Sequence, residues 1–419
     1  MRRLIGGLLL GIAIGGHDGS GAEALKTDYK PGTFGYDAAF LKKHTDTIIL
    51  GRGDARVLVA PAYQGRVMTS TTEGMPGPSY GWLNYNVIES GILSEESRKG
   101  KLQDHIYVFG GEERFWLGPE GGQFAIFFAP GAKFDFASWH TPAAIDTEPF
   151  EIVRQTKTSA TFTRQFELVN YGGAKLKIGV DRTVRVLDTD EAGKAIGIPI
   201  GKGLKAVAYE SDNRLTNRGE EPWTKEQGLL SIWLLGMYRP APATTVVIPF
   251  KAGPESELGP KVNDAYFGKV PPEYLIVKDN VLFFKGDGAR RGKIGISPAR
   301  SLGLAGSYAP DCRTLTLVTY NVPGKHGGYV NSMWELQKDP FSGDALNSYN
   351  DGSPEPGKPP LGPFYELETS SPAAALKAGE SLQHVQRTVH ISGNEQELDV
   401  IARAKLGVGI EEIKAAFAK

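Results

Sequence analysis

Two glutamates, Glu366 and Glu368, stand two residues apart in the segment GPFYELETSS, residues 362–371. The segment is rich in strand formers, and side chains at positions i and i+2 of a strand point to the same face, about 7 Å apart. Neighbouring carboxylates titrate at different pH values, so one can donate a proton while the other accepts one. The pattern predicts acid–base chemistry on a substrate such as a sugar, unless both acids simply face solvent, as charged residues usually do.

A second candidate lies in HIYVFGGEERFWLGPEGGQFAIFF, residues 105–128, where glycine turns flank acidic, basic and aromatic residues. Carboxylates and guanidinium groups bond hydroxyls in fixed directions, and an indole packs on the apolar face of a sugar ring. The alternative is an exposed turn with a salt-bridged arginine. The candidate sugar-binding residues in this segment are His105, Arg114, Trp116 and Glu120.

A third candidate is NSMWELQKDPFSGDALNSYNDG, residues 331–352, which is dense in Asn, Asp and aromatic residues. Such a composition suits a sugar or a hard cation such as Ca²⁺. The segment lacks the D-x-[DN]-x-[DN]-G spacing of a calcium loop, so we predict no metal here. The alternative is a solvated loop built on Asx turns. The candidate sugar-binding residues are Asn331, Trp334, Glu335 and Asn350.

The histidines are scattered, and no H-E-x-x-H motif or close metal-binding pair occurs. His384 and His390 lie on the strand predicted within residues 376–393, and a histidine would sit near the two glutamates if that strand paired with theirs. The sequence also lacks a P-loop, a G-x-S-x-G elbow and a Rossmann fingerprint after a strand. We therefore expect no cofactor, and we disfavour nucleotide-binding and serine-hydrolase functions.

The elements that must position these residues are mostly strands. Alternating apolar and polar residues predict strands with turn signals between them, and a chain so rich in them favours a sandwich or barrel. The predicted strands include 123–128, 161–170, 180–187, 313–322 and a hairpin within 274–285. Helix signals are confined to the ends of the chain, at 36–44, after Asn394 and at 409–417.

The chain has 419 residues, 40% of them hydrophobic and 23% charged, with a formal net charge of −1. This composition is typical of a packed globular protein and offers no basic field for nucleic acid. Residues 1–24 resemble a secretory signal peptide, with Arg2 and Arg3, a short apolar run and an A-x-A cleavage pattern. We expect a periplasmic or secreted protein without a stable membrane anchor, with one domain over 25–419 whose C-terminal helices span 394–419.

The run YELETSSPAAALKAGES resembles the end of aldose 1-epimerases (galactose mutarotases). The chain is closer still to a family of exported bacterial proteins of unknown function with a galactose-mutarotase-like fold, through LVAPAYQGRVMTST, VDRTVRVL and the three segments above. The resemblance implies an all-β fold, a large twisted antiparallel β-supersandwich with short terminal helices. It also implies that Glu368 is the general base that takes the proton of the anomeric hydroxyl.

One departure from the mutarotase pattern concerns the acid. Mutarotases carry a histidine in a T-N-H-S-Y-W-N-L type segment, whereas the corresponding region here has Trp233 near that place and no histidine lies between residues 141 and 325. Trp233 is a further candidate sugar-binding residue. His140 or His105 could supply the acid from elsewhere. We expect an exported carbohydrate-active protein with aldose 1-epimerase-like chemistry; a non-catalytic glycan-binding module and a glycoside hydrolase or lyase using the paired carboxylates are the alternatives.

Overall fold

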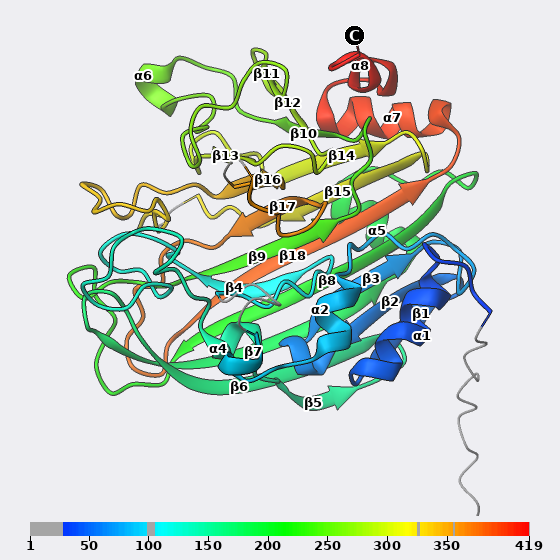
Figure 1. The fold of residues 1–419 in the computed structure, drawn as a ribbon. Coiled ribbons are helices and arrows are strands. Elements are labelled where there is room, and N and C mark those ends of the chain that lie inside the picture. Colours follow the sequence, from blue (N-terminus) through cyan, green and yellow to red (C-terminus); the bar gives the residue numbers. More distant parts are fainter. Residues whose placement is uncertain (1–27, 99–104, 325–326, 355–356, 419) are drawn as a thin grey trace, which may run out of the picture.

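The structure is a computed structural model that describes residues 28–98, 105–324, 327–354 and 357–418. The predicted signal peptide, residues 1–24, lies outside the described residues. The chain forms three sheets in which every pairing of neighbouring strands is antiparallel (Figure 1). The predicted all-β fold class, with large antiparallel sheets and short helices, is confirmed.

The largest sheet has ten strands, and the four longest strands of the molecule are neighbours within it. In spatial order its strands are β11 (Leu275–Val277), β12 (Val281–Lys285), β10 (Thr245–Pro249), β14 (Leu304–Ala309), β15 (Thr314–Tyr320), β18 (Ser381–Ser392), β8 (Lys205–Asn217), β7 (Lys175–Leu187), β6 (Ser159–Val169) and β5 (Glu151–Gln155).

A five-stranded sheet packs against the ten-stranded sheet, and a three-stranded sheet lies beside them. The five strands are, in spatial order, β13 (Gly292–Ile296), β16 (Leu346–Asn350), β17 (Tyr365–Ser370), β9 (Ser231–Tyr238) and β4 (Arg114–Gly118). The three-stranded sheet consists of β1 (Ile48–Arg52), β2 (Ala55–Ala60) and β3 (Arg66–Thr71).

The core between the two larger sheets follows from the period of two along each strand. Phe115 of β4 and Ile232 of β9 are fully buried in one cluster with Val180 and Val184 of β7. A second cluster joins Tyr365, Leu367 and their neighbours to strands β10, β12 and β15. Because alternate residues of β4, β9 and β17 fill this core, the residues between them must project from the other face of the five-stranded sheet.

The helices are short and lie around the sheets. They are α1 (Phe34–His44), α2 (Tyr85–Ser90), α3 (Glu95–Arg98), α4 (Ala143–Asp146), α5 (Thr189–Ile196), α6 (Glu255–Leu258), α7 (Glu395–Leu406) and α8 (Ile410–Ala415), with a 3₁₀ turn η1 (Pro61–Tyr63). Helices α5, α7 and α8 share an apolar cluster with strands of the ten-stranded sheet and cover part of its outer face (Figure 1). Within the described ranges, no helix combines the length and hydropathy needed to cross a bilayer.

Most of the predicted elements are present. The hairpin within 274–285 is the pair β11 and β12, and α1, α7 and α8 occupy the predicted helical segments. The side chain of Asn394 caps α7 by accepting a hydrogen bond from the Glu397 N–H, as predicted. The five helices α2 to α6, away from the chain ends, were not predicted, although Asp188 and Glu191 form a full capping box at the start of α5.

The strand predicted at 123–128 is wrong. Apart from one isolated bridge between Phe128 and Trp139, these residues form turns, and the Ala125 N–H donates to the Gly122 carbonyl. The rings of Phe127 and Phe128 pack among other aromatic rings, with Phe127 stacked on Trp139. The run is apolar because it lines an aromatic cluster, and an apolar run of this length cannot by itself report a ladder of hydrogen bonds.

Candidate functional site

Strand β17 presents both glutamates on the outer face of the five-stranded sheet. It lies between β16 and β9, where Glu366 is opposite Tyr349 and Met237, and Glu368 is opposite Asn347 and Leu235. The alternate residues Tyr365, Leu367 and Thr369 face the core between the sheets. The prediction that the two acids share one face of a strand is therefore confirmed, and that face is not open solvent, because both glutamates are buried.

Glu368 is held in a buried ion pair. Its Oε2 accepts hydrogen bonds from Lys293 Nζ and from Trp233 Nε1, each at 2.9 Å. Glu368 is fully buried, and its second oxygen, Oε1, has no hydrogen-bond partner among the described residues. Burial lowers the pKa of Lys293, but the charges of Glu368, Glu120 and Glu366 outweigh burial and raise that pKa overall.

Glu366 pairs with a different cation. Its Oε1 lies 3.0 Å from an Arg114 guanidinium nitrogen, and the same guanidinium stacks over the Trp116 ring at 3.9 Å from the ring centroid. Burial raises the pKa of Glu366 to about 8; Arg114 acts in the opposite direction, and the negative charge of Glu368 raises the pKa further. A carboxyl with such a pKa keeps its proton near neutral pH, so it can both donate and accept hydrogen bonds.

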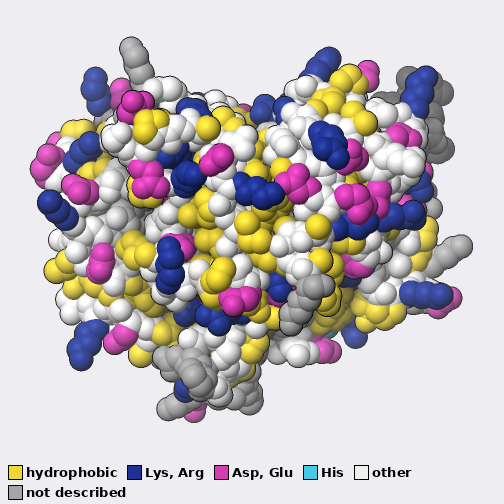
Figure 2. All heavy atoms as spheres, turned by 90° about the horizontal axis from the view of Figure 1, so that it is seen from above, with side chains coloured by type: hydrophobic (Ala, Val, Ile, Leu, Met, Phe, Trp, Pro, Cys, Tyr) yellow, Lys and Arg dark blue, Asp and Glu magenta, His cyan; other side chains and the backbone are white. Residues whose placement is uncertain are grey.

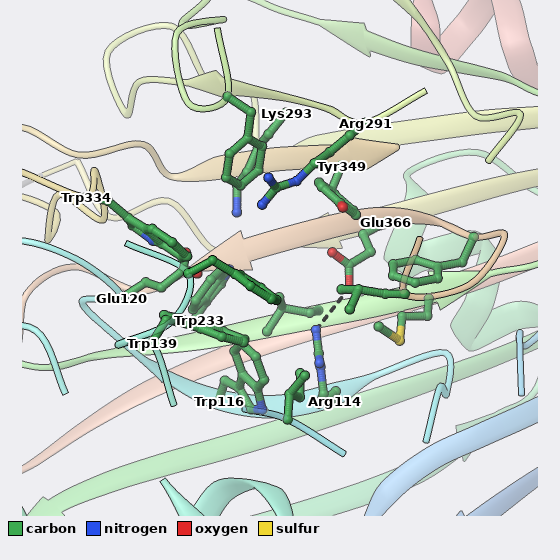
Figure 3. Close-up of a pocket in the computed structure, with 17 residues that line it drawn as sticks. Arg114, Trp116, Glu120, Trp139, Trp233, Arg291, Lys293, Trp334, Tyr349 and Glu366 are labelled. Atoms are coloured by element: carbon green, nitrogen blue, oxygen red, sulfur yellow. Dashed lines mark hydrogen bonds and ion pairs between the residues drawn. The ribbon is translucent and has the colours of Figure 1, made fainter. Parts of the chain in front are cut away.

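A cavity opens above these pairs on the outer face of the sheet (Figure 3). Four of the six tryptophans of the chain line it, together with charged side chains from β4, β13 and β17. Its volume is about 80 Å³, several times the about 10–15 Å³ that one enclosed water needs. The cavity is therefore larger than a single-water void. Its aromatic and charged lining comprises Arg114, Trp116, Glu120, Phe136, Trp139, Trp233, Phe267, Arg291, Lys293, Trp334, Tyr349, Phe364 and Glu366.

Glu120 faces Glu366 across the cavity, beneath the ring of Trp334 (Figure 3). Burial raises its pKa, while Lys293 lowers it and Glu368 raises it further. The floor of the cavity thus carries two acids with raised pKa values, and both lie within the influence of the same ammonium group of Lys293. Glu366, with a pKa of about 8, can exchange a proton with a ligand near neutral pH.

Six of the residues predicted from the sequence line this cavity, although they come from four separate segments of the chain. They are Arg114, Trp116, Glu120, Trp233, Trp334 and Glu366. Glu368 does not line the cavity but lies directly behind Lys293 and Trp233, which do. The proximity of these segments could not be read from the sequence, because it depends on which strands pair.

The remaining candidates lie elsewhere. His105 and His140 contact each other, with Nδ1 to Nε2 at 3.3 Å, and His105 packs edge-on to Phe136 at the wall of the cavity. Asn350 is fully buried and holds the turn that precedes β13, through hydrogen bonds to Asp287, Gly288 and Arg290. The Asn331 side chain accepts a hydrogen bond from the Met333 N–H, and Glu335 is exposed.

Histidines from the neighbouring strand do not approach the glutamates. Strand β18 belongs to the ten-stranded sheet, so His384 and His390 project into the core behind β17. His384 bonds Thr369 at 2.8 Å, on the inner face of that strand, and His390 bonds Glu112 at 3.0 Å. Within the described ranges, no group of three His, Cys, Asp or Glu side chains is placed to hold a metal ion.

Four important residues of the site were not predicted. Lys293 comes from β13 and Arg291 from the residue just before that strand, Trp139 comes from the loop before α4, and Tyr349 from β16. In this strand Lys293 and Gly295 alternate with the apolar Ile294 and Ile296. That alternation is a strand signal, and it could have placed Arg291 and Lys293 together on the polar face. Nothing in the sequence indicated that this face would meet Glu368.

Taken together, the fold and the site define an antiparallel β-sandwich protein with an aromatic, ionisable cavity on the outer face of its smaller sheet. Residues 32–417 match the model of a family of unknown function, DUF6786, and the chain belongs to that family. The predicted membership of a family of unknown function is confirmed. No curated protein matches this sequence.

Several solved structures have a similar course of the chain. They include Slr1438 from Synechocystis sp. PCC 6803, with 13% identity and a TM-score of 0.47, covering 84% of this chain and 96% of that one. A galactose mutarotase-like protein from Lactobacillus casei ATCC 334 has 12% identity and a TM-score of 0.44, and the alignment covers 82% of this chain and 100% of that one. A putative aldose 1-epimerase from Escherichia coli K12 has 12% identity and a TM-score of 0.46, and the alignment covers 83% of this chain and 99% of that one.

Proposed function

We propose that this protein binds a sugar in the cavity of the five-stranded sheet and catalyses proton transfer at its anomeric centre, as aldose 1-epimerases do. The observation that carries the proposal is the combination of four tryptophans with two buried acids of raised pKa around one cavity. Indole faces stack on the apolar face of a sugar, and a buried carboxyl near its pKa is suited to acid–base catalysis.

Glu366 is the residue proposed to move the protons. In its neutral form the carboxyl has one O–H donor and one acceptor oxygen. It would protonate the ring oxygen as the bond from that oxygen to the anomeric carbon breaks, and its other oxygen would take the proton of the anomeric hydroxyl. The products are the open-chain aldehyde and a carboxyl that is protonated again, so closure on either face of the aldehyde gives either anomer.

This assignment differs from the one implied by the sequence resemblance, which points to Glu368 as base. Glu368 is fully buried, and its Oε2 is occupied by Lys293 and Trp233. Its Oε1 has no hydrogen-bond partner among the described residues but is buried as well, and Glu368 does not line the cavity. We therefore propose that Glu368 orients Lys293 and Trp233, whereas Glu366, which lines the cavity, acts on the sugar.

The test is polarimetry of freshly dissolved α-D-glucose and α-D-galactose with the wild-type protein and with the Glu366→Gln and Glu368→Gln variants. We expect faster mutarotation with the wild type, loss of that acceleration in Glu366→Gln, and its decline as the pH rises through about 8, where the Glu366 proton is lost. Full activity in Glu366→Gln would refute the assignment.

The burial of Glu368 also favours a second candidate function, a non-catalytic glycan-binding protein of the same architecture. The one oxygen of Glu368 without a hydrogen-bond partner among the described residues is buried. Glu368, which the resemblance implies is the catalytic base, therefore has no open path to a ligand. This candidate predicts sugar binding, measured by quenching of tryptophan fluorescence, without any acceleration of mutarotation. Glu366→Gln would then alter the affinity alone.

A further inference from the structure

Arg291 places a third cation in the cavity, immediately before strand β13. Its guanidinium lies over the Phe267 ring at 3.7 Å from the centroid, which restricts the side chain to one position. Figure 3 shows the guanidinium turned into the cavity beside the ammonium of Lys293. Asn350 fixes the turn before Arg291, so the backbone that carries the guanidinium is itself held by hydrogen bonds.

Arg291 differs from the other two cations of the cavity because it has no partner acid. Arg114 pairs with Glu366 and Lys293 pairs with Glu368, whereas within the described ranges the Arg291 guanidinium has no ion pair or hydrogen bond. Asp351 is close enough for Arg291 to lower its pKa. Both Asp351 oxygens, however, already accept hydrogen bonds, from the Tyr349 hydroxyl and the Gly362 N–H.

Arg114 and Lys293 each have a paired acid, whereas Arg291 and the third acid of the cavity, Glu120, form no ion pair among the described residues, although Arg291 is close enough to lower the pKa of Glu120. Arg291 and Lys293 are like charges side by side, an arrangement that is unfavourable unless an anion joins them. Burial also raises the pKa values of Glu120 and Glu366, so these two acids neutralise less positive charge near neutral pH than free glutamates would. The cavity is therefore suited to a ligand that brings negative charge of its own.

We propose that the sugar bound in this cavity carries an anionic substituent, a carboxylate, sulfate or phosphate, that Arg291 binds through its planar fork of donors. This inference rests on the proposed sugar-binding function and adds the class of sugar to it. The guanidinium is preorganised by Phe267, so little side-chain freedom is lost when the anion binds. Lys293 would contribute its charge without leaving Glu368.

The test compares matched pairs of neutral and anionic sugars by isothermal titration calorimetry. The probes are D-glucose against D-glucuronate, glucose 6-sulfate and glucose 6-phosphate, and D-galactose against D-galacturonate. The proteins are the wild type, Arg291→Gln and the matched control Arg290→Gln, because Arg290 is the exposed neighbour that does not line the cavity.

We expect the wild type to bind at least one anionic probe about 10- to 100-fold more tightly than its neutral parent, the range for a charge-assisted hydrogen bond. Arg291→Gln should abolish this preference, so that the anionic probe binds no more tightly than its neutral parent, and Arg290→Gln should leave the preference unchanged. The identity of the preferred probe distinguishes carboxylate from sulfate and phosphate.

Two results would overturn the inference in different ways. Equal or tighter binding of the neutral sugars, or a preference for anions that survives in Arg291→Gln, would refute the anionic ligand and leave the sugar-binding function standing. The absence of binding to every probe, neutral and anionic, would refute the proposed function itself. Unchanged urea unfolding of Arg291→Gln confirms that a loss of binding is not a loss of fold.

Discussion

Replacing Lys293 by methionine removes one partner of the buried ion pair with Glu368 and keeps most of the volume of the side chain. The two side chains are 6% and 0% exposed, and Nζ lies 2.9 Å from Oε2. Removing one partner of such a pair leaves the other charge buried and unpaired, which lowers the free energy of unfolding by about 3–5 kcal/mol. We expect Lys293→Met to lower the free energy of unfolding by about that amount.

The double variant Lys293→Met with Glu368→Gln removes both charges, so it should be less destabilised than the sum of the two single variants. We expect a coupling free energy of about 2–3 kcal/mol, near the upper end for residues in contact. The control is Lys205→Met, because Lys205 pairs with Glu73 at 3.0 Å with side chains that are 60% and 40% exposed. That pair should contribute less than about 1 kcal/mol.

The assay is urea unfolding at pH 7, followed both by tryptophan fluorescence and by circular dichroism of the strands. Trp233 donates to Glu368, so its fluorescence reports directly on the site. Agreement of the two probes checks that unfolding is a single transition. Additive effects of the two single substitutions, within about 0.5 kcal/mol, would show that Lys293 and Glu368 do not depend on each other and would refute the reasoning.

Three further predictions concern Glu366, Trp233 and Asn394. Burial raises the pKa of Glu366 from 4.5 to about 8, so the folded state binds its proton more tightly than the unfolded chain. Stability should therefore fall as the pH rises from about 4.5 to 8, by up to about 1.4 kcal/mol per pH unit, and Glu366→Gln should lose this slope in urea unfolding at pH 5.5 and 7.5. Trp233→Phe removes the N–H that bonds Glu368 and should cost about 1.5–3 kcal/mol; Trp116→Phe, whose Nε1 has no partner among the described residues, should cost less under the same assay. Asn394→Ala removes the cap of α7 and should cost about 1 kcal/mol, and an unchanged urea midpoint would contradict the capping role.

The strands were predictable where the residues alternate between two faces. The alternation in residues 365–369 correctly placed Glu366 and Glu368 on one face and Leu367 on the other. The apolar run at 123–128 misled, because Phe127 and Phe128 are apolar for packing among rings and not for pairing in a sheet. Within a strand, the alternation of polar and apolar residues thus predicts which face of the sheet a side chain is on. Whether a short apolar run forms a strand at all is predicted less well.

The assembly of the site was less predictable than its members. Arg114 and Glu366 are 252 residues apart in the chain, and Lys293 and Glu368 are 75 apart. Their contacts follow from the spatial order β13, β16, β17, β9, β4, which is set by long-range pairing and has no local signal. For the same reason, the sequence could suggest two unpaired acids on β17 but could not indicate that each has a cation of its own.

The alternation on β17 also limits how this sheet can vary in length. Deleting or inserting one residue in the strand would turn Glu366 and Glu368 into the core and Leu367 into the cavity, because a shift of one residue exchanges the two faces. The loop at 253–273 contains no strand, so its length is not tied to the alternation of a sheet, although Phe267 within it contacts Arg291. Proteins that share this fold should therefore differ in loop length and keep the residue count of the five strands, so new ligand preferences would arise by substitution on the sheet and by lengthening of the loops around it.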